Sequence, residues 1–185
     1  SILEVFVGKS INIIDWDSEQ SIATTILLDY IREKQLDIKI ENIVLISEVE
    51  NKLSRGLLHC NILKNNTEKI IGINKNLESV SDDELNISNN SIVINLIYNT
   101  NLSNFTRVTD SQHGNYLIAL STTKDDDKID QFIQCHKEKY RFNIISKRND
   151  KIGRFQRSEA ILSKRNSDIP DERWIERLWE WADEN

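Results

Sequence analysis

Acidic side chains recur in pairs at two predicted strand ends. Asp15 and Asp17 are two residues apart, Glu48 and Glu50 have the same spacing, and Lys52 follows. Because side chains alternate along a strand, residues i and i+2 face the same side, so each pair can present two carboxylates together. Carboxylates hold hydrated Mg²⁺, and a nearby lysine can stabilise charge on an attacking water or a phosphate. The candidate metal ligands are therefore Asp15, Asp17, Glu48 and Glu50, and the candidate catalytic residues are Glu50 and Lys52.

The other chemistry-bearing residues match no complete motif. Gly8-Lys9-Ser10 resembles the end of a phosphate-binding loop, but the glycine that this motif requires five residues earlier is absent. The pairs His59-Cys60 and Cys135-His136 consist of sequence neighbours, which point in different directions on a strand or a helix and do not chelate zinc easily. No catalytic motif rises above chance, so the function must be inferred from other features.

The last twelve residues hold three of the chain's four tryptophans. At about 100° per residue, Trp174, Leu178, Trp179 and Trp181 lie on one face of a helix, and charged residues fill the other. A helix this rich in tryptophan must dock, either on its own domain or on another chain. Position in the sequence does not separate these two modes.

Charge is distributed unevenly along the chain. Residues 137–165 carry ten basic and three acidic side chains, a net charge of +7, whereas the whole chain is −6 and the remainder is therefore −13. Such segregation points to an anionic partner, nucleic acid included, or to a basic segment that neutralises an acidic surface within one assembly. A helix predicted at 152–165 would present Arg154 and Arg157 to that partner.

Hydrophobic periodicity predicts the elements that must position these residues. Strands at 2–7 and 11–16 form a hairpin, a helix follows at 18–34, and a second hairpin links strands at 57–64 and 69–74 after a strand at 38–48. Residues 76–90 read as a surface loop before a strand at 91–98. A strand at 116–120, a helix at 126–140 and a strand at 142–145 imply a right-handed crossover.

These elements predict one α/β or α+β domain, with a mixed sheet covered by the helices at 18–34 and 126–140. Residues 1–147 form the core, and residues 148–185 form a helical extension that contains the basic helix and the tryptophan-rich helix. No segment reaches the 18 apolar residues of a membrane span, and the beginning of the chain lacks signal-peptide features, which favours a cytoplasmic protein.

The sequence favours a non-enzymatic interaction module of a larger complex, without a cofactor. A protein partner or a second copy would bind through Trp174, Leu178, Trp179 and Trp181, and nucleic acid through segment 137–165, including Arg154 and Arg157. The alternative is a Mg²⁺-dependent nuclease built on the carboxylates.

Overall fold

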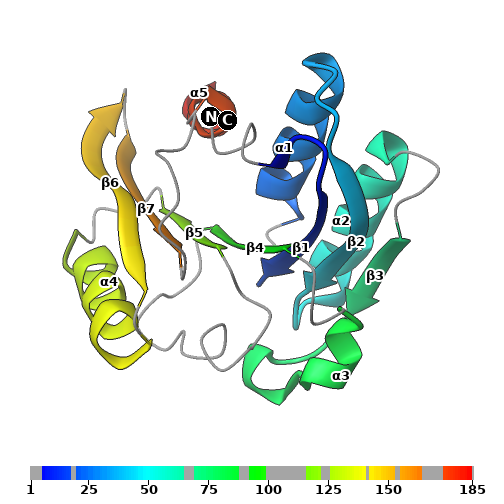
Figure 1. The fold of residues 1–185 in the computed structure, drawn as a ribbon, viewed down its shortest axis with the longest axis horizontal. Coiled ribbons are helices and arrows are strands. Elements are labelled where there is room, and N and C mark those ends of the chain that lie inside the picture. The colour runs from blue at the N-terminus through cyan, green and yellow to red at the C-terminus, as the bar shows by residue number, and fades with distance from the viewer. Residues whose placement is uncertain are drawn as a thin grey trace.

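A computed structural model describes residues 6–17, 20–64, 69–87, 92–98, 116–121, 126–140, 142–152, 155–163 and 173–184 (Figure 1). The strands in this part of the chain are β1 (Ser10–Trp16), β2 (Lys39–Ile46), β3 (Lys69–Ile73), β4 (Ile92–Tyr98), β5 (Tyr116–Ser121), β6 (Asn143–Ile152) and β7 (Phe155–Ser163). The helices are α1 (Ile22–Glu33), α2 (Glu50–Leu63), α3 (Asp82–Leu85), α4 (Asp126–Tyr140) and α5 (Arg173–Glu184), with a short 3₁₀ turn at Leu77–Ser79.

The strands form one mixed sheet in the order β3-β2-β1-β4-β5-β7-β6. β1 pairs in parallel with both β2 and β4, and β2–β3 and β4–β5 are also parallel. β7 is antiparallel to β5 and to β6. The chain first builds outward from β1 to β3 and then returns to the other side of β1 as β4, so the strand order reverses between β1 and β4.

Helices cover both faces of the sheet, because its parallel strands are buried on both sides. One face carries Ile11 and Ile13 of β1 and packs against α1, α2 and α5. The opposite face carries Ile14 and Trp16 and packs against α3 and α4. Figure 1 shows α5 above the sheet and α3 and α4 below it. The single domain with a mixed sheet flanked by helices, predicted from the sequence, is confirmed.

Helix α5 docks within its own chain, which is one of the two modes expected from the sequence. Trp174, Leu178 and Trp179 are buried in the core shared with α1, whereas Trp181 is 36% exposed. Arg177 of α5 pairs with Glu33 of α1 at 2.8 Å. The apolar face of the helix is therefore used by this domain, and only Trp181 presents its indole at the surface.

Residues 155–163, the described part of the basic helix predicted at 152–165 apart from Ile152 of β6, form the strand β7, so that prediction is wrong. Its described side chains alternate: Arg157, Glu159 and Ile161 face α5, while Ala160 and Leu162 face α4. This period of two is that of a strand. Arg154 lies outside the described residues. The boundary predicted at residue 147, between the core and the C-terminal extension, falls inside strand β6.

Three further predictions are corrected. The segment 57–64 lies mostly in α2, because Leu53, Gly56 and Cys60 recur at helical spacing on its buried side. Strand β1 pairs with β2 and β4 rather than in a hairpin, and residues 2–5 lie outside the described part. The loop predicted at 76–90 contains the 3₁₀ turn and α3. β5 and β6 run in the same direction, as the crossover implied, but β7 lies between them.

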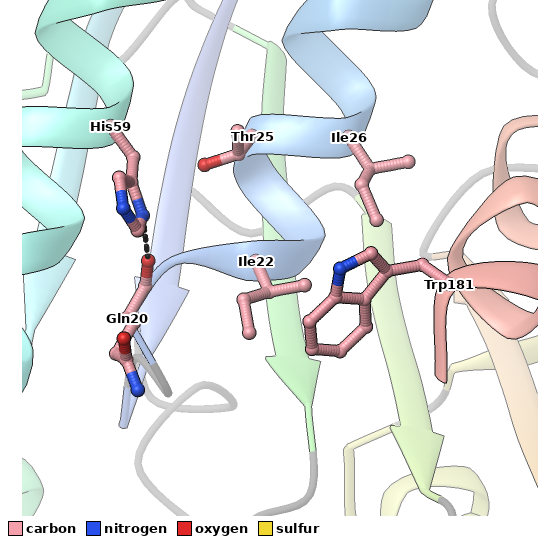
Figure 2. Close-up of a pocket in the computed structure, with 6 residues that line it drawn as sticks. All are labelled: Gln20, Ile22, Thr25, Ile26, His59 and Trp181. Carbon is pink, nitrogen blue, oxygen red and sulfur yellow. Dashed lines mark hydrogen bonds between the residues drawn. The ribbon is translucent and has the colours of Figure 1, made fainter. Parts of the chain in front are cut away.

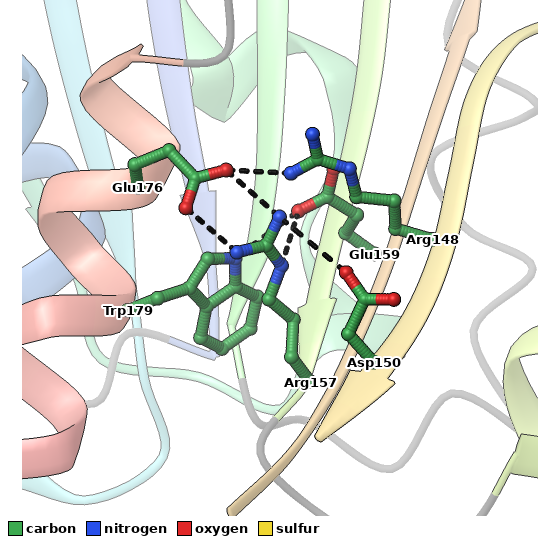
Figure 3. A network of polar contacts seen from close by, with 6 residues as sticks. All are labelled: Arg148, Asp150, Arg157, Glu159, Glu176 and Trp179. Atoms are coloured by element: carbon green, nitrogen blue, oxygen red, sulfur yellow. Dashed lines mark hydrogen bonds and ion pairs between the residues drawn. The ribbon is translucent and has the colours of Figure 1, made fainter. Parts of the chain in front are cut away.

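Arg157 is the centre of a buried polar network that fastens α5 to the sheet (Figure 3). Its guanidinium donates to both carboxylate oxygens of Glu176, at 2.7 and 2.8 Å, and its Nε lies 3.3 Å from Glu159 Oε2. The indole of Trp179 donates to the same Glu159 oxygen at 3.1 Å, and Arg148 donates to Glu176 at 2.5 Å. Arg157 is thus engaged inside the fold rather than presented to a partner.

Replacing Leu178 with alanine is expected to lower the free energy of unfolding by about 2–5 kcal/mol, because its side chain is fully buried and its loss leaves a cavity. Urea unfolding followed by far-UV circular dichroism measures the change. Glu180→Ala, at an exposed position of the same helix, is the matched control. Equal midpoints for the two variants would contradict the placement of α5 in the core.

Candidate functional site

Polar side chains gather where the central parallel strands end. Asp17 follows β1, and Ser47 and Glu48 follow β2. The side chain of Asn74 donates to the Ser47 carbonyl at 2.8 Å, and the side chain of Asn76 donates to the Glu48 carboxylate. Because β1, β2 and β3 are parallel, these ends share one edge of the sheet, and Asn74 and Asn76 hold the end of β2 against the end of β3. In open α/β sheets, ligands bind at this edge where the strand order reverses.

The turn between β1 and α1 has the left-handed backbone that glycine usually supplies, but it contains no glycine. Asp17, Gln20 and Ser21 have φ angles of 55°, 60° and 57°. Helix α2 approaches this turn through Gly56, where an added Cβ would lie 2.4 Å from Ser21 Oγ and 3.3 Å from the Gln20 carbonyl carbon. The glycine that permits close approach is therefore on the helix, and the turn itself carries side chains.

Asp15 is buried beneath this turn and is not available as a metal ligand. It lies in β1 between Leu45 and Leu96 of the neighbouring strands. Thr24 Oγ1 of α1 donates to its Oδ2 at 2.5 Å. Burial raises the pKa of Asp15 to about 7, and the negative charge of Asp17 adds to this, although the Thr24 hydrogen bond opposes it. The side chain therefore takes up a proton near neutral pH.

The carboxylates singled out in the sequence do not converge on a metal site. Asp15 is buried against α1, Glu48 is held by Asn76, and Glu50 is an exposed residue in the first turn of α2. Lys52 lies half-buried on the same helix. Within the described ranges, no three His, Cys, Asp or Glu side chains are grouped so that they could hold a metal ion.

Sequence reasoning missed Thr24, Gly56, Asn74 and Asn76. The three polar residues have no local signature, because their partners lie on other elements. Gly56 carried a usable signal, since a glycine inside a helix lowers helix stability and often marks a close contact. It was hidden here because the segment 57–64 was read as a strand.

A pocket of about 430 Å³ opens beside the same turn, across the outer side of α1 (Figure 2). Its lining consists of Gln20, Ile22, Thr25, Ile26, His59 and Trp181. His59 Nδ1 donates to the Gln20 carbonyl at 3.2 Å, and Thr25 Oγ1 donates to the Ser21 carbonyl at 2.7 Å. The lining therefore combines an apolar wall with polar groups that are already oriented.

Known proteins resemble this chain in structure and not in sequence. No family model and no curated protein matches it. M. capricolum TrmK, solved with S-adenosyl-homocysteine, is 15% identical with a TM-score of 0.56, over 95% of this chain and 71% of that one. An rRNA methylase from Streptococcus thermophilus is 11% identical with a TM-score of 0.57, and the match covers 88% of this chain and 91% of that one. A putative tRNA (m1A22) methyltransferase from Streptococcus pneumoniae, solved with S-adenosyl-L-methionine, is 11% identical with a TM-score of 0.55. That match covers 98% of this chain and 87% of the other.

The chain has the Rossmann-like fold of these methyltransferases. This finding corrects the function predicted from the sequence, since the similar structures are enzymes rather than interaction modules, and they are not nucleases. It also corrects the expectation of no cofactor or of Mg²⁺, because two of them hold an S-adenosyl compound. A protein partner has no support in these comparisons. Among the described helices, none is long and apolar enough to cross a membrane.

Asp15 is expected to make the fold less stable as pH rises. Its pKa is about 7 in the folded protein against an ordinary 3.8, so between these values the unfolded chain releases a proton that the folded chain retains. The free energy of unfolding should fall by about 1.4 kcal/mol per pH unit over this window, beyond the contribution of other groups. Asp15→Asn should remove this component, as measured by urea unfolding between pH 5 and pH 8. Asp29→Asn, at a solvent-accessible site on α1, is the control, and the same slope in wild type and Asp15→Asn would refute the assignment.

Gly56→Ala is expected to displace the β1–α1 turn and to destabilise the fold by about 1–3 kcal/mol, because the added methyl group overlaps Ser21. This is the reverse of the usual effect of alanine in a helix, which is stabilising by about 1 kcal/mol. Thermal and urea unfolding show whether the substitution lowers or raises the free energy of unfolding. Ser54→Ala, at an exposed position of α2, provides the reference, and a stabilised Gly56→Ala variant would show that the helix does not contact the turn.

Proposed function

We propose that this chain is an S-adenosylmethionine-dependent methyltransferase that acts on RNA. The observation that carries the proposal is the fold of the mixed sheet β3-β2-β1-β4-β5-β7-β6, which is similar to solved methyltransferases over most of the chain. The reversal of strand order between β1 and β4 places the expected ligand crevice at the edge where Asp17 and Glu48 lie. Fold alone does not select a ligand, so the residues at this edge must be considered.

The β1–α1 turn disfavours a dinucleotide. Binding a pyrophosphate requires glycines that let the backbone approach it closely, together with helix N–H groups that face its negative charge. Here the turn carries side chains at its left-handed positions, and Asp17 adds a negative charge. S-adenosylmethionine has no phosphate and carries positive sulfonium and ammonium groups, so an acidic turn complements it. The turn therefore suits the cation better than a pyrophosphate.

Glu48 suits the sugar of the same cofactor. An acidic residue at the end of the second strand is the group that binds ribose hydroxyls in nucleotide-binding sheets. Asn76 donates to one carboxylate oxygen of Glu48 and so fixes the orientation of the side chain. We assign Glu48 to the ribose hydroxyls, Asn76 to the positioning of Glu48, and Asp17 to the cationic end of the cofactor.

S-adenosylmethionine, when bound, supplies an activated methyl group, and the protein supplies binding and orientation. RNA is the proposed acceptor because similar structures are described as tRNA and rRNA methyltransferases. The basic segment 137–165 supports the same acceptor. Its residues Lys137 and Lys147 are exposed and can contact a phosphate backbone, whereas Arg148 and Arg157 of the same segment pair with Glu176 of α5.

Isothermal titration calorimetry with S-adenosyl-homocysteine tests the cofactor. Wild-type protein should bind it and should not bind NAD⁺. Glu48→Ala should weaken binding by about tenfold or more, since a hydrogen bond to a charged group is lost. Glu50→Ala, at an exposed carboxylate two residues further along, should leave affinity unchanged. Transfer of a labelled methyl group from S-adenosylmethionine to a tRNA and rRNA mixture tests the reaction. Failure to bind S-adenosyl-homocysteine, or equal binding of NAD⁺, would overturn the proposal.

A further inference from the structure

The pocket beside α1 is lined by residues of three helices and by Gln20 of the β1–α1 turn. Figure 2 shows α1 between its neighbours, with His59 of α2 on one side and Trp181 of α5 on the other. Its volume of about 430 Å³ lies within the range of small-molecule sites. No residue of the pocket belongs to the proposed cofactor contacts Asp17, Glu48 and Asn76.

Trp181 supplies the wall on which a planar ring can stack. It is 36% exposed, whereas Trp16, Trp174 and Trp179 are at most 3% exposed. In Figure 2 its indole lies beside Ile22, and Ile22 and Ile26 continue the apolar wall along α1. A large aromatic side chain kept at the surface beside a cavity is the usual platform for a nucleic-acid base.

The polar lining offers hydrogen bonds of a defined kind. The Thr25 hydroxyl gives its proton to the Ser21 carbonyl, so its oxygen accepts on the pocket side. Because His59 Nδ1 donates to the Gln20 carbonyl, the other ring nitrogen, Nε2, is the one that can accept a hydrogen bond. These two acceptors match the amino and imino donors at the edge of an unpaired nucleobase.

Charge beside the pocket indicates where a phosphate would lie. The cationic residues Lys52 and Arg55 precede His59 by seven and four positions on α2, so they share one side of that helix with this pocket residue. Arg55 is exposed and stands one turn from His59. On the other flank, the neighbours of Trp181 on α5 include the exposed acids Glu180 and Glu184. An anionic group is therefore favoured on the α2 side only.

We infer that this pocket binds one unpaired nucleotide of the RNA substrate, with the base stacked on Trp181 and the 5′-phosphate beside Arg55. The inference rests on the proposed function, because it names the part of an RNA substrate that the domain would hold. This pocket binds a nucleotide and does not catalyse a reaction.

Calorimetric titration of adenosine 5′-monophosphate into the full chain saturated with S-adenosyl-homocysteine tests the inference. Wild type should bind the nucleotide saturably. Trp181→Ala should weaken binding by about tenfold or more, and Trp181→Phe, which retains an aromatic face, should recover most of the loss. Arg55→Ala should weaken the nucleotide but not adenosine, and should remove the decline of affinity with salt. Leu58→Ala, at an exposed α2 residue outside the pocket lining, is the matched control and should change nothing.

The outcomes separate this inference from the proposed function. Binding of S-adenosyl-homocysteine with no nucleotide binding, or with nucleotide binding that Trp181→Ala leaves intact, would overturn the pocket assignment alone. Nucleotide binding that depends on Trp181 in a chain that fails to bind S-adenosyl-homocysteine would retain the pocket and overturn the cofactor. Equal affinities of wild type and Arg55→Ala would refute the position assigned to the phosphate.

Discussion

The parallel pairing of β1 with both β2 and β4 is the constraint from which the rest of the structure follows. A strand hydrogen-bonded on both edges in parallel cannot be reached by tight turns, so the chain must leave and return through crossovers. Those crossovers place α1 and α2 on one face, and both faces of the sheet then need an apolar cover. The same pairing creates the reversal of strand order, and therefore the edge where a ligand can bind.

Helix α5 completes the cover where α1 and α2 do not reach. Its apolar residues pack in the cluster that includes Ile118 of β5 and Ile161 of β7. This packing of α5 buries two charged side chains, Arg157 and Glu159, at the contact between α5 and β7. Glu176, Arg148 and Asp150 complete the network, so it holds two positive and three negative side chains. Directional bonds of this kind fix how the helix sits on the sheet, which apolar packing alone specifies poorly.

Local patterns predicted the elements far better than they predicted their partners. The helices at 18–34 and 126–140, the terminal helix and most strands follow from periodicity, and together they indicate the fold class. The errors lie in segments whose apolar residues fit the spacing of a strand and the spacing of a helix about equally well. In 57–64 an apolar run fits a strand as well as a helix, and in 155–163 a few apolar residues at helical spacing hid the alternation around Arg157. The convergence of Asn76 on Glu48 depends on pairings between distant strands, so no sequence pattern could reveal it.

The β1–α1 turn adopts left-handed backbone conformations without a glycine. A left-handed φ costs an ordinary residue about 1–2 kcal/mol, and Asp17, Gln20 and Ser21 all adopt one. Such strain persists only when the surroundings hold it. Here the Thr25 hydroxyl donates to the Ser21 carbonyl, His59 donates to the Gln20 carbonyl, and Gly56 leaves room for the Ser21 side chain. The conformation of the turn is therefore kept by its neighbours on α1 and α2, and the turn includes the acidic side chain of Asp17. By its charge, an acidic turn of this kind disfavours a phosphate and favours a cation, and this is the physical basis of the cofactor proposed for this edge of the sheet.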